Sequence, residues 1–205
     1  MAKRFQDLGP LTNGEPMSIL AFKKEQRLEL WKQRESGWEM VCSYPFTGYS
    51  GTLGPKLEEG DGQIPEGIYQ IEYLNPNSSY HLSIKLDYPN SFDRKMADVD
   101  GREELGFDIF IHGSSATIGC IPIGDEAIEE LFYLIAKNGY SNVTTIITPV
   151  DFRLGAAPPE VDGIGWEADL YAKLSKRLKD YPIPENPNNE DDNKEHQLPT
   201  VPPSS

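Results

Sequence analysis

Two residue types that can carry out nucleophilic catalysis stand close together in the segment "IHGSSATIGC", residues 111–120. His112 is one of three histidines and Cys120 one of two cysteines in a chain of 205 residues. A cysteine nucleophile needs a base that takes its proton and hydrogen-bond donors that bind the oxyanion formed during attack. Because an imidazole can act as that base, the pair is a candidate for cysteine-dependent acyl transfer.

The residues around this pair allow the chain to bring the two side chains together. His112 ends a strand-like pattern, and the small residues 113–117 form a loop long enough to fold Cys120 back beside it. Gly119 permits a sharp turn and leaves the neighbouring backbone N–H groups unshielded as oxyanion donors. A helix is expected to begin near Asp125, and its positive end would favour the thiolate form of the cysteine.

The elements that must position the pair are mostly strands. Alternating or clustered apolar residues predict strands at residues 18–22, 27–31, 38–44, 68–74, 81–88, 106–113 and 143–150. These patterns predict an α+β fold that is mainly β-strand, with two or more peripheral helices.

Two amphipathic helices are indicated in the second half of the chain. The first begins with Asp125 as its expected N-cap and is expected to end at Gly139. Its apolar positions recur at helical spacing, at Ile128, Leu131, Phe132 and Ile135. The second helix, within residues 165–181, carries an apolar stripe of Trp166, Leu170, Leu174 and Leu178.

The composition excludes several function classes. A net charge of −14 and the lack of a long Lys/Arg cluster make nucleic acid an unlikely partner class, so we expect none. No run of eighteen apolar residues occurs, so no transmembrane segment is expected. The N-terminus shows no apolar signal region, which leaves a trimmed chain, another export route or delivery as an effector open. The sequence leaves the oligomeric state open.

The chain divides into three expected parts. Residues 1–17 are expected to be an N-terminal extension and residues 18–181 the catalytic domain. Residues 182–205 are rich in Pro, Asn and acidic residues and poor in apolar ones, so they are expected to form a disordered tail. His196 lies in that tail and is expected to take no part in function.

The segment "IHGSSATIGCIPIGDEAIEEL", residues 111–131, resembles the active-site segment of the YkuD-type L,D-transpeptidase catalytic domain family. That family carries His-Gly, a variable loop and then Ser/Thr-x-Gly-Cys, which correspond here to His112-Gly113 and to residues 117–120. Residues 50–71 and 80–94 are similar to the YafK-like branch of the family. The resemblance covers roughly residues 19–181 and implies an L,D-transpeptidase-like sandwich or barrel.

The resemblance implies a cysteine acyltransferase that acts on peptidoglycan stem peptides at the cell wall or periplasm, without cofactor or metal. Cys120 would attack a carbonyl at the L-centre of a diamino acid residue and form a thioester, which an amine or water then resolves. His112 would be the base, oriented by the carbonyl of Gly113. The amides around Gly119 and Cys120 would bind the oxyanion, and Thr117 would shape the groove.

Other features of the family pattern concern the product and the groove. Many members have Ile/Val-Arg after the cysteine, whereas Ile121-Pro122 stands here, and the loop before the cysteine is shorter than in most cross-linking members. Both traits favour hydrolysis, of a carboxypeptidase or endopeptidase type, over cross-linking. Tyr80, His81 and Tyr88 would line the groove, and Lys56 would pair with a substrate carboxylate.

Other readings of the same residues remain open. A zinc site of Cys42, His81, His112 and Cys120 lacks the short ligand spacing usual in structural sites. A Cys42–Cys120 disulfide would need an oxidising compartment and would silence the nucleophile; Cys42 is otherwise expected in the core as a small apolar residue. At the level of function, the alternatives are a non-catalytic wall-binding module and a secreted antibacterial effector with the same chemistry.

Overall fold

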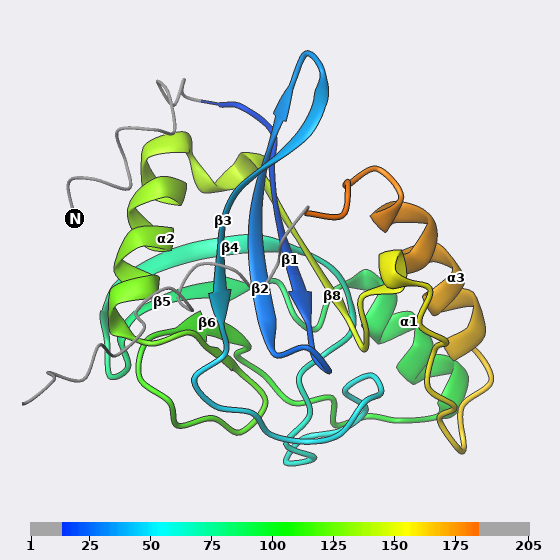
Figure 1. The fold of residues 1–205 in the computed structure, drawn as a ribbon. Helices are drawn as coiled ribbons and strands as arrows, with labels where there is room; N and C mark the ends of the chain where they lie inside the picture. The colour runs from blue at the N-terminus through cyan, green and yellow to red at the C-terminus, as the bar shows by residue number, and fades with distance from the viewer. Residues whose placement is uncertain (1–13, 185–205) are drawn as a thin grey trace, which may run out of the picture.

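A computed structural model describes residues 14–184, which form one eight-stranded sheet with three α-helices (Figure 1). The expected α+β, mainly β-strand class is therefore confirmed. Most of the expected N-terminal extension, almost all of the expected tail and His196 lie outside the described residues.

The sheet has the strand order β3-β2-β1-β8-β4-β5-β6-β7. Its strands are β1 (Met17–Phe22), β2 (Arg27–Arg34), β3 (Gly37–Pro45), β4 (Gly67–Ser78), β5 (His81–Leu86), β6 (Phe110–His112), β7 (Ile121–Pro122) and β8 (Val143–Thr148). Strand β6 is shorter than expected because Gly106 and Asp108 have positive φ angles of 82° and 49°, which interrupt an extended backbone. The short strand β7 was not foreseen in the sequence.

Both faces of the central strands are covered by a helix. Strand β1 pairs antiparallel with β2 and parallel with β8, so it lies in the interior of the sheet. Its side chains alternate between the two faces of the sheet, and both of these faces are buried. Helix α2 (Asp125–Asn138) packs its apolar side chains into the cluster that contains Ile19 and Ala21. Helix α3 (Glu167–Leu178) packs into a second cluster with Leu20 and Phe22.

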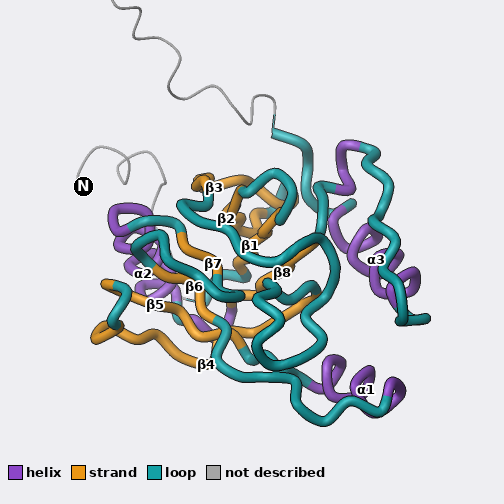
Figure 2. The backbone as a smooth tube through the Cα atoms, turned by 90° about the horizontal axis from the view of Figure 1, so that it is seen from below, coloured by secondary structure: helices purple, strands orange, loops and turns teal. Residues whose placement is uncertain are grey.

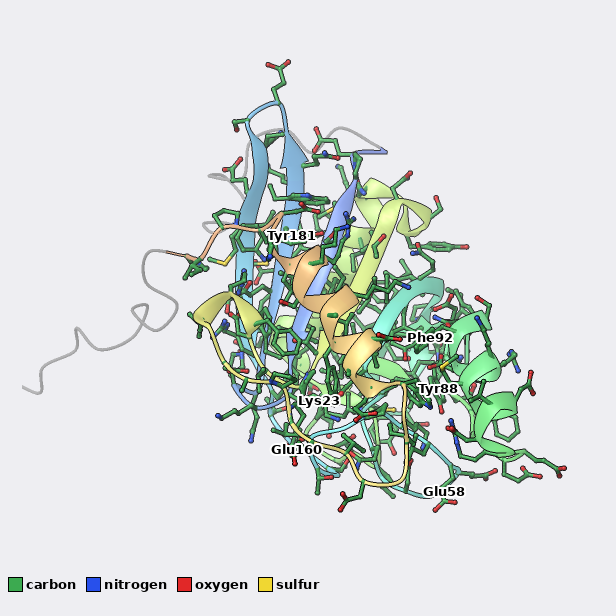
Figure 3. The ribbon with its side chains drawn as sticks, turned by 90° about the vertical axis from the view of Figure 1, so that its right-hand side faces the viewer. Lys23, Glu58, Tyr88, Phe92, Glu160 and Tyr181 are labelled. Atoms are coloured by element: carbon green, nitrogen blue, oxygen red, sulfur yellow. The ribbon has the colours of Figure 1, made fainter. Side chains whose placement is uncertain are left out.

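Most residues of the stripes expected on these two helices are buried, whereas Phe132 and Trp166 are half-buried and Trp166 precedes α3. Ile128, Leu131 and Ile135 of α2 are buried, as are Leu170, Leu174 and Leu178 of α3. Burying one such side chain contributes about 1.5–3 kcal/mol. Figure 3 shows α3 lying across the strands, with Tyr181 beyond its C-terminal end, where the Tyr181 hydroxyl donates to Ser18 Oγ at 2.7 Å.

Helix α1 (Ser91–Asp100) was not predicted from the sequence. Only Met96 and Ala97 of this helix are buried, so its sequence carries little of the apolar periodicity that predicts a helix. A capping box formed by Asn90 and Asp93 begins it instead. No helix in the range 14–184 is long and apolar enough to cross a bilayer.

The start of α2 corrects the expected N-cap. Gly124, with φ of 81°, occupies that position, and Asp125 is the first helical residue. The carboxylate of Asp125 accepts a hydrogen bond from the backbone N–H of Ser114 at 2.7 Å. Asp125 therefore ties the loop after β6 to the start of α2 instead of capping the helix.

Long loops gather at the lower end of the sheet in Figure 1 and cross in front of β6 and β7 in Figure 2. They follow β3 and β6 and precede β6. A buried ion pair anchors the first of them: Lys23 Nζ lies 2.9 Å from Glu66 and donates to the carbonyls of Gly54 and Ile64 at 2.6 and 2.9 Å. Tyr171 of α3 donates to the same glutamate at 2.8 Å. Loop, sheet and helix are thereby joined at one charge pair.

Replacement of Lys23 tests this anchor. Lys23→Met leaves Glu66 as a buried carboxylate without its cation, so we expect the free energy of unfolding to fall by about 3–5 kcal/mol. Denaturant unfolding measures the change. Asp180→Ala, which breaks the exposed Arg177–Asp180 pair, is the control and should cost less than about 1 kcal/mol. Equal stability of the two variants would show that the buried pair anchors nothing.

Candidate active site

The pairing of β6 with its neighbours decides which side chains meet. Ile111 pairs with Ile121 of β7 and with Ile84 of β5, and all three side chains point into the core. Because side chains alternate along a strand, His112 points to the opposite face of the sheet. That face is the one on which the loops lie (Figure 2).

Cys120 joins this face through strand β7. The register pairs His112 with Pro122, and continuing it by one residue beyond Ile121 places Cys120 beside Phe110. Cys120 itself lies in a bend, directly before β7. The pairing therefore brings His112 in β6 and Cys120, just before β7, onto adjoining segments of the chain.

The thiol contacts the backbone before β6 rather than the imidazole. Cys120 Sγ donates to the carbonyl oxygen of Asp108 at 3.7 Å. Within residues 14–184, no hydrogen bond joins Cys120 to His112. A catalytic hydrogen bond is often long or unformed before substrate binds, so this geometry is compatible with a proton transfer that occurs only in the complex.

His112 is held in a single tautomer. The side chain is buried, with 1% exposure, and its Nδ1 donates to the carbonyl of Gly113 at 2.5 Å. This is the contact that the family resemblance implies. Burial lowers the pKa of His112 and outweighs the hydrogen bond to Gly113, which raises it. The neutral imidazole thus carries its proton on Nδ1 and keeps a lone pair on Nε2, as a general base requires.

The pKa of the Cys120 thiol is raised, mainly by burial. A hydrogen bond from the Phe110 backbone and the charges of Lys56 and Lys85 lower it, and the carboxylate of Asp108 raises it. The thiol and not the expected thiolate is therefore the favoured form, while the effect of the start of α2 on its own stays a prediction. Desolvation outweighs the favourable charges, so the resting site holds a neutral thiol beside a neutral imidazole.

The two backbone amides expected to bind an oxyanion already have partners. The N–H of Cys120 donates to Thr117 Oγ1 at 2.9 Å, and the Thr117 hydroxyl donates back to the Cys120 carbonyl at 2.7 Å. The N–H of Gly119 donates to Ser50 Oγ at 2.8 Å. Thr117 thus fixes the backbone of Cys120, and Ser50 is a residue of the candidate site that sequence reasoning missed. Its only sequence signal is its position at the start of the similar segment 50–71.

Gly119 is required at its position for two reasons. Its φ is 101°, which side chains of L residues rarely adopt, and a Cβ there would lie 2.9 Å from the carbonyl oxygen of Gln63. The turn before Cys120 therefore depends on this glycine.

The turn between β4 and β5 covers the imidazole. The ring of Tyr80, which is exposed to solvent, lies 4.6 Å from that of His112, measured between centroids. His81 points elsewhere: its Nε2 lies 2.7 Å from Glu129 Oε1 of α2. Tyr88 does not line a groove, because it is buried and donates to the carbonyl of Leu105. Tyr80 is therefore the member of this set whose ring lies against that of His112.

Lys56 is already bound within the protein. Its ammonium group donates to Asp61 Oδ1 at 2.6 Å and to the carbonyl of Glu58 at 2.9 Å. A substrate carboxylate would have to compete with Asp61 for this lysine.

The alternatives based on the second cysteine find no geometric support. Cys42 and Cys120 are both free thiols, and Cys42 Sγ donates to the Tyr44 hydroxyl at 3.0 Å. Among the described residues, no three His, Cys, Asp or Glu side chains are grouped so that they could hold a metal ion. Cys42 packs against the core cluster, as expected of a small apolar residue.

Comparison with known proteins shows that most of this chain matches the model of a known protein family. Residues 16–150 match the family model described as "L,D-transpeptidase catalytic domain" (YkuD). Over 124 residues the chain is 36% identical to the Escherichia coli (strain K12) protein named "Putative L,D-transpeptidase YafK". That alignment covers 60% of this chain and 48% of the relative, so the chain spans about half the length of the curated relatives it matches.

Solved structures share the fold at lower identity. The helical cell shape determining protein Pgp2 from Campylobacter jejuni has a TM-score of 0.52 and 21% identity, covering 65% of this chain and 48% of that chain. Bd1075 of Bdellovibrio bacteriovorus has a TM-score of 0.50 and 17% identity, covering 81% and 55%. These likenesses concern the fold.

The protonation state of the thiol is directly measurable. In the Cys42→Ser variant, we expect the rate of Cys120 alkylation by iodoacetamide to rise with pH through a midpoint above that of an ordinary cysteine thiol, because burial raises its pKa. The thiolate is the reacting form, so the rate should be low at neutral pH. A midpoint below that of an unperturbed cysteine peptide, measured alongside, would contradict the neutral resting pair.

Proposed function

This chain belongs to the L,D-transpeptidase catalytic domain family, and from that membership we propose that it is a cysteine-dependent enzyme acting on peptidoglycan stem peptides. The observation that carries the proposal is the parallel pairing of β6, which contains His112, with β7, which begins directly after Cys120. We assign the catalytic unit to residues 18–181, since α3 lies beyond the family match yet packs against the sheet. The proposed site of action is the cell wall or periplasm.

In the proposed first step, His112 Nε2 takes the proton of the Cys120 thiol as the sulfur attacks a carbonyl at the L-centre of a diamino acid residue. A sulfur–carbon bond forms, and the carbon–nitrogen bond to the following group breaks. The departing amine takes the proton from His112, leaving a thioester on Cys120. The Gly113 carbonyl keeps the imidazole in the tautomer that allows both transfers.

The oxyanion of this step needs donors that the resting site has engaged elsewhere. The amides of Gly119 and Cys120 point to the hydroxyls of Ser50 and Thr117. In one proposed route, these two hydroxyls move away and release the amides to bind the oxyanion. In the other, the Ser50 hydroxyl keeps accepting from Gly119 and donates its own hydrogen bond to the oxyanion. Either route keeps the donors close to the thiol.

We propose that water, rather than a second peptide amine, resolves the thioester. Water gives a proton to His112, its oxygen bonds to the carbonyl carbon, the sulfur–carbon bond breaks, and the sulfur regains the proton. Two features support hydrolysis. The position after Cys120 is the buried Ile121 of β7 followed by Pro122, with no arginine. The short loop before Cys120 is pinned where the Thr47 hydroxyl donates to the Ser114 carbonyl at 2.6 Å.

A non-catalytic wall-binding module is the second candidate. The observation that favours it is the resting geometry, in which the thiol donates to Asp108 and both neighbouring amides are occupied. Such a module would bind muropeptides and leave a product chromatogram unchanged after long incubation.

Removal of the nucleophile separates the two candidates. Cys120→Ala is expected to lower turnover of defined tetrapeptide and pentapeptide muropeptides by about a thousandfold or more while leaving the thermal melt unchanged. His112→Ala should lower turnover similarly, and Cys42→Ser should not. Mass spectrometry of the products measures all three. Turnover by Cys120→Ala at the parent rate would remove the catalytic assignment.

Isotope labelling tests the choice of water as acceptor. In water enriched in oxygen-18, hydrolysis places one label in the new carboxyl group of the shortened peptide, whereas transfer to an amine places none. We expect labelled, shortened peptides to be the main product. Unlabelled cross-linked or exchanged peptides as the main product would contradict the preference for hydrolysis.

A further inference from the structure

Lys85 of β5 is a buried cation beside the proposed nucleophile. Its side chain is 7% exposed, and its Nζ donates to the carbonyl of Leu86 at 2.9 Å. It lies 3.2 Å from Glu72 and 3.6 Å from Asp108, whose side chains are 50% and 71% exposed. A buried ammonium is costly unless it is compensated. Here the compensating carboxylates face solvent while the cation lies inside.

The strand register places this cation on the face of the site. Lys85 pairs with Phe110, so its side chain lies on the same face as those of Phe110 and His112. Its ammonium group lies 5.8 Å from the centre of the Phe110 ring. Since Cys120 adjoins Phe110 on the other side, Lys85 and Cys120 flank the same residue of β6.

Asp108 links Lys85 to the thiol directly. Its carbonyl oxygen accepts from Cys120 Sγ at 3.7 Å, while its carboxylate lies 3.6 Å from Lys85 Nζ. One residue therefore contacts the sulfur through its backbone and the cation through its side chain.

A second buried cation approaches the same segment from the loop after β3. A Cβ on Gly106 would lie 3.4 Å from Lys56 Cε, so the stem of Lys56 passes close to the chain just before Asp108. Lys56 is 8% exposed, and Asp61 partly compensates its charge. Two ammonium groups thus lie near the segment that touches the thiol.

The charges near the sulfur act in opposite directions. Lys56 and Lys85 lower the pKa of Cys120, whereas Asp108 raises it. His112 is neutral and makes no hydrogen bond to the thiol, and the carboxylate of Glu72 pairs with Lys85. The cations that can compensate a sulfur anion in this site are therefore lysines.

We propose that Lys85, together with Lys56, stabilises negative charge on the sulfur of Cys120, a task that the His112 imidazole does not perform in the resting site. The inference rests on the proposed function only in taking Cys120 as the nucleophile. Asp108 acts in the opposite sense. The balance of these three charges sets how readily the sulfur becomes anionic once His112 removes its proton.

The test is the pH profile of Cys120 alkylation by iodoacetamide in the full chain with Cys42→Ser, where the sulfur–carbon bond forms and iodide leaves. Lys85→Met removes the charge and keeps an apolar stem, and should raise the midpoint by about half a pH unit or more. Asp108→Asn should lower it. Lys85→Arg should stay near the parent value, and Lys95→Met, at an exposed position on α1, should not move it.

The opposite signs distinguish charge from packing. If Lys85 and Asp108 merely hold the segment in place, removal of either loosens it, and both midpoints move in the same direction, which overturns the proposal. An unchanged midpoint in Lys85→Met also overturns it. Should that variant unfold, Asp108→Asn decides alone, since its side chain is exposed: a midpoint that does not fall overturns the proposal.

Alkylation also separates this inference from the proposed function. Failure of the parent protein to process muropeptides would remove the enzymatic assignment and leave the shifts of the midpoint intact. If turnover depends on Cys120 but the alkylation midpoint is unchanged in the Lys85 and Asp108 variants, the enzymatic assignment stands and the inference about the lysines is overturned.

Discussion

The parallel pairing of two very short strands, β6 and β7, is the constraint on which the site depends. It commits Ile111 and Ile121 to the core, sends His112 to the opposite face and brings Cys120, one residue before β7, next to β6. A shift of the register by one residue would turn the imidazole into the apolar core. The large apolar cluster therefore also orients the imidazole, because alternation along the strand leaves it no other direction.

The site that results is electrically neutral at its centre and charged at its edge. Burial suppresses both the imidazolium of His112 and the thiolate of Cys120, while Lys56 and Lys85 stand near the sulfur with their counter-ions. Such an arrangement keeps the resting thiol protonated and protects it from adventitious chemistry. In this arrangement the sulfur becomes negatively charged only when a base removes its proton. The lysines are already in place at that moment and need little reorganisation to stabilise the charge.

Much of the fold and part of the site could be predicted from the sequence, because local patterns of residues determine these features. Alternation predicted most of the strands, helical spacing predicted α2 and α3, and the family resemblance implied the contact between His112 and Gly113. Helix α1 was missed because caps rather than an apolar stripe define it. Ser50, Lys85 and the Asp108 carbonyl were missed because only long-range pairing of strands and loops brings Ser50 to Gly119 and the other two towards Cys120, and no local pattern encodes that pairing.

The central claim is that the sulfur of Cys120 forms a covalent bond to the acyl group of a stem peptide. Rapid-quench mass spectrometry of the intact protein mixed with a tetrapeptide muropeptide measures that bond directly. The account predicts a transient mass increase equal to the acyl fragment, localised by digestion to Cys120 and absent from Cys120→Ala. Product formation without any adduct on Cys120, or with an adduct on another residue, would contradict it.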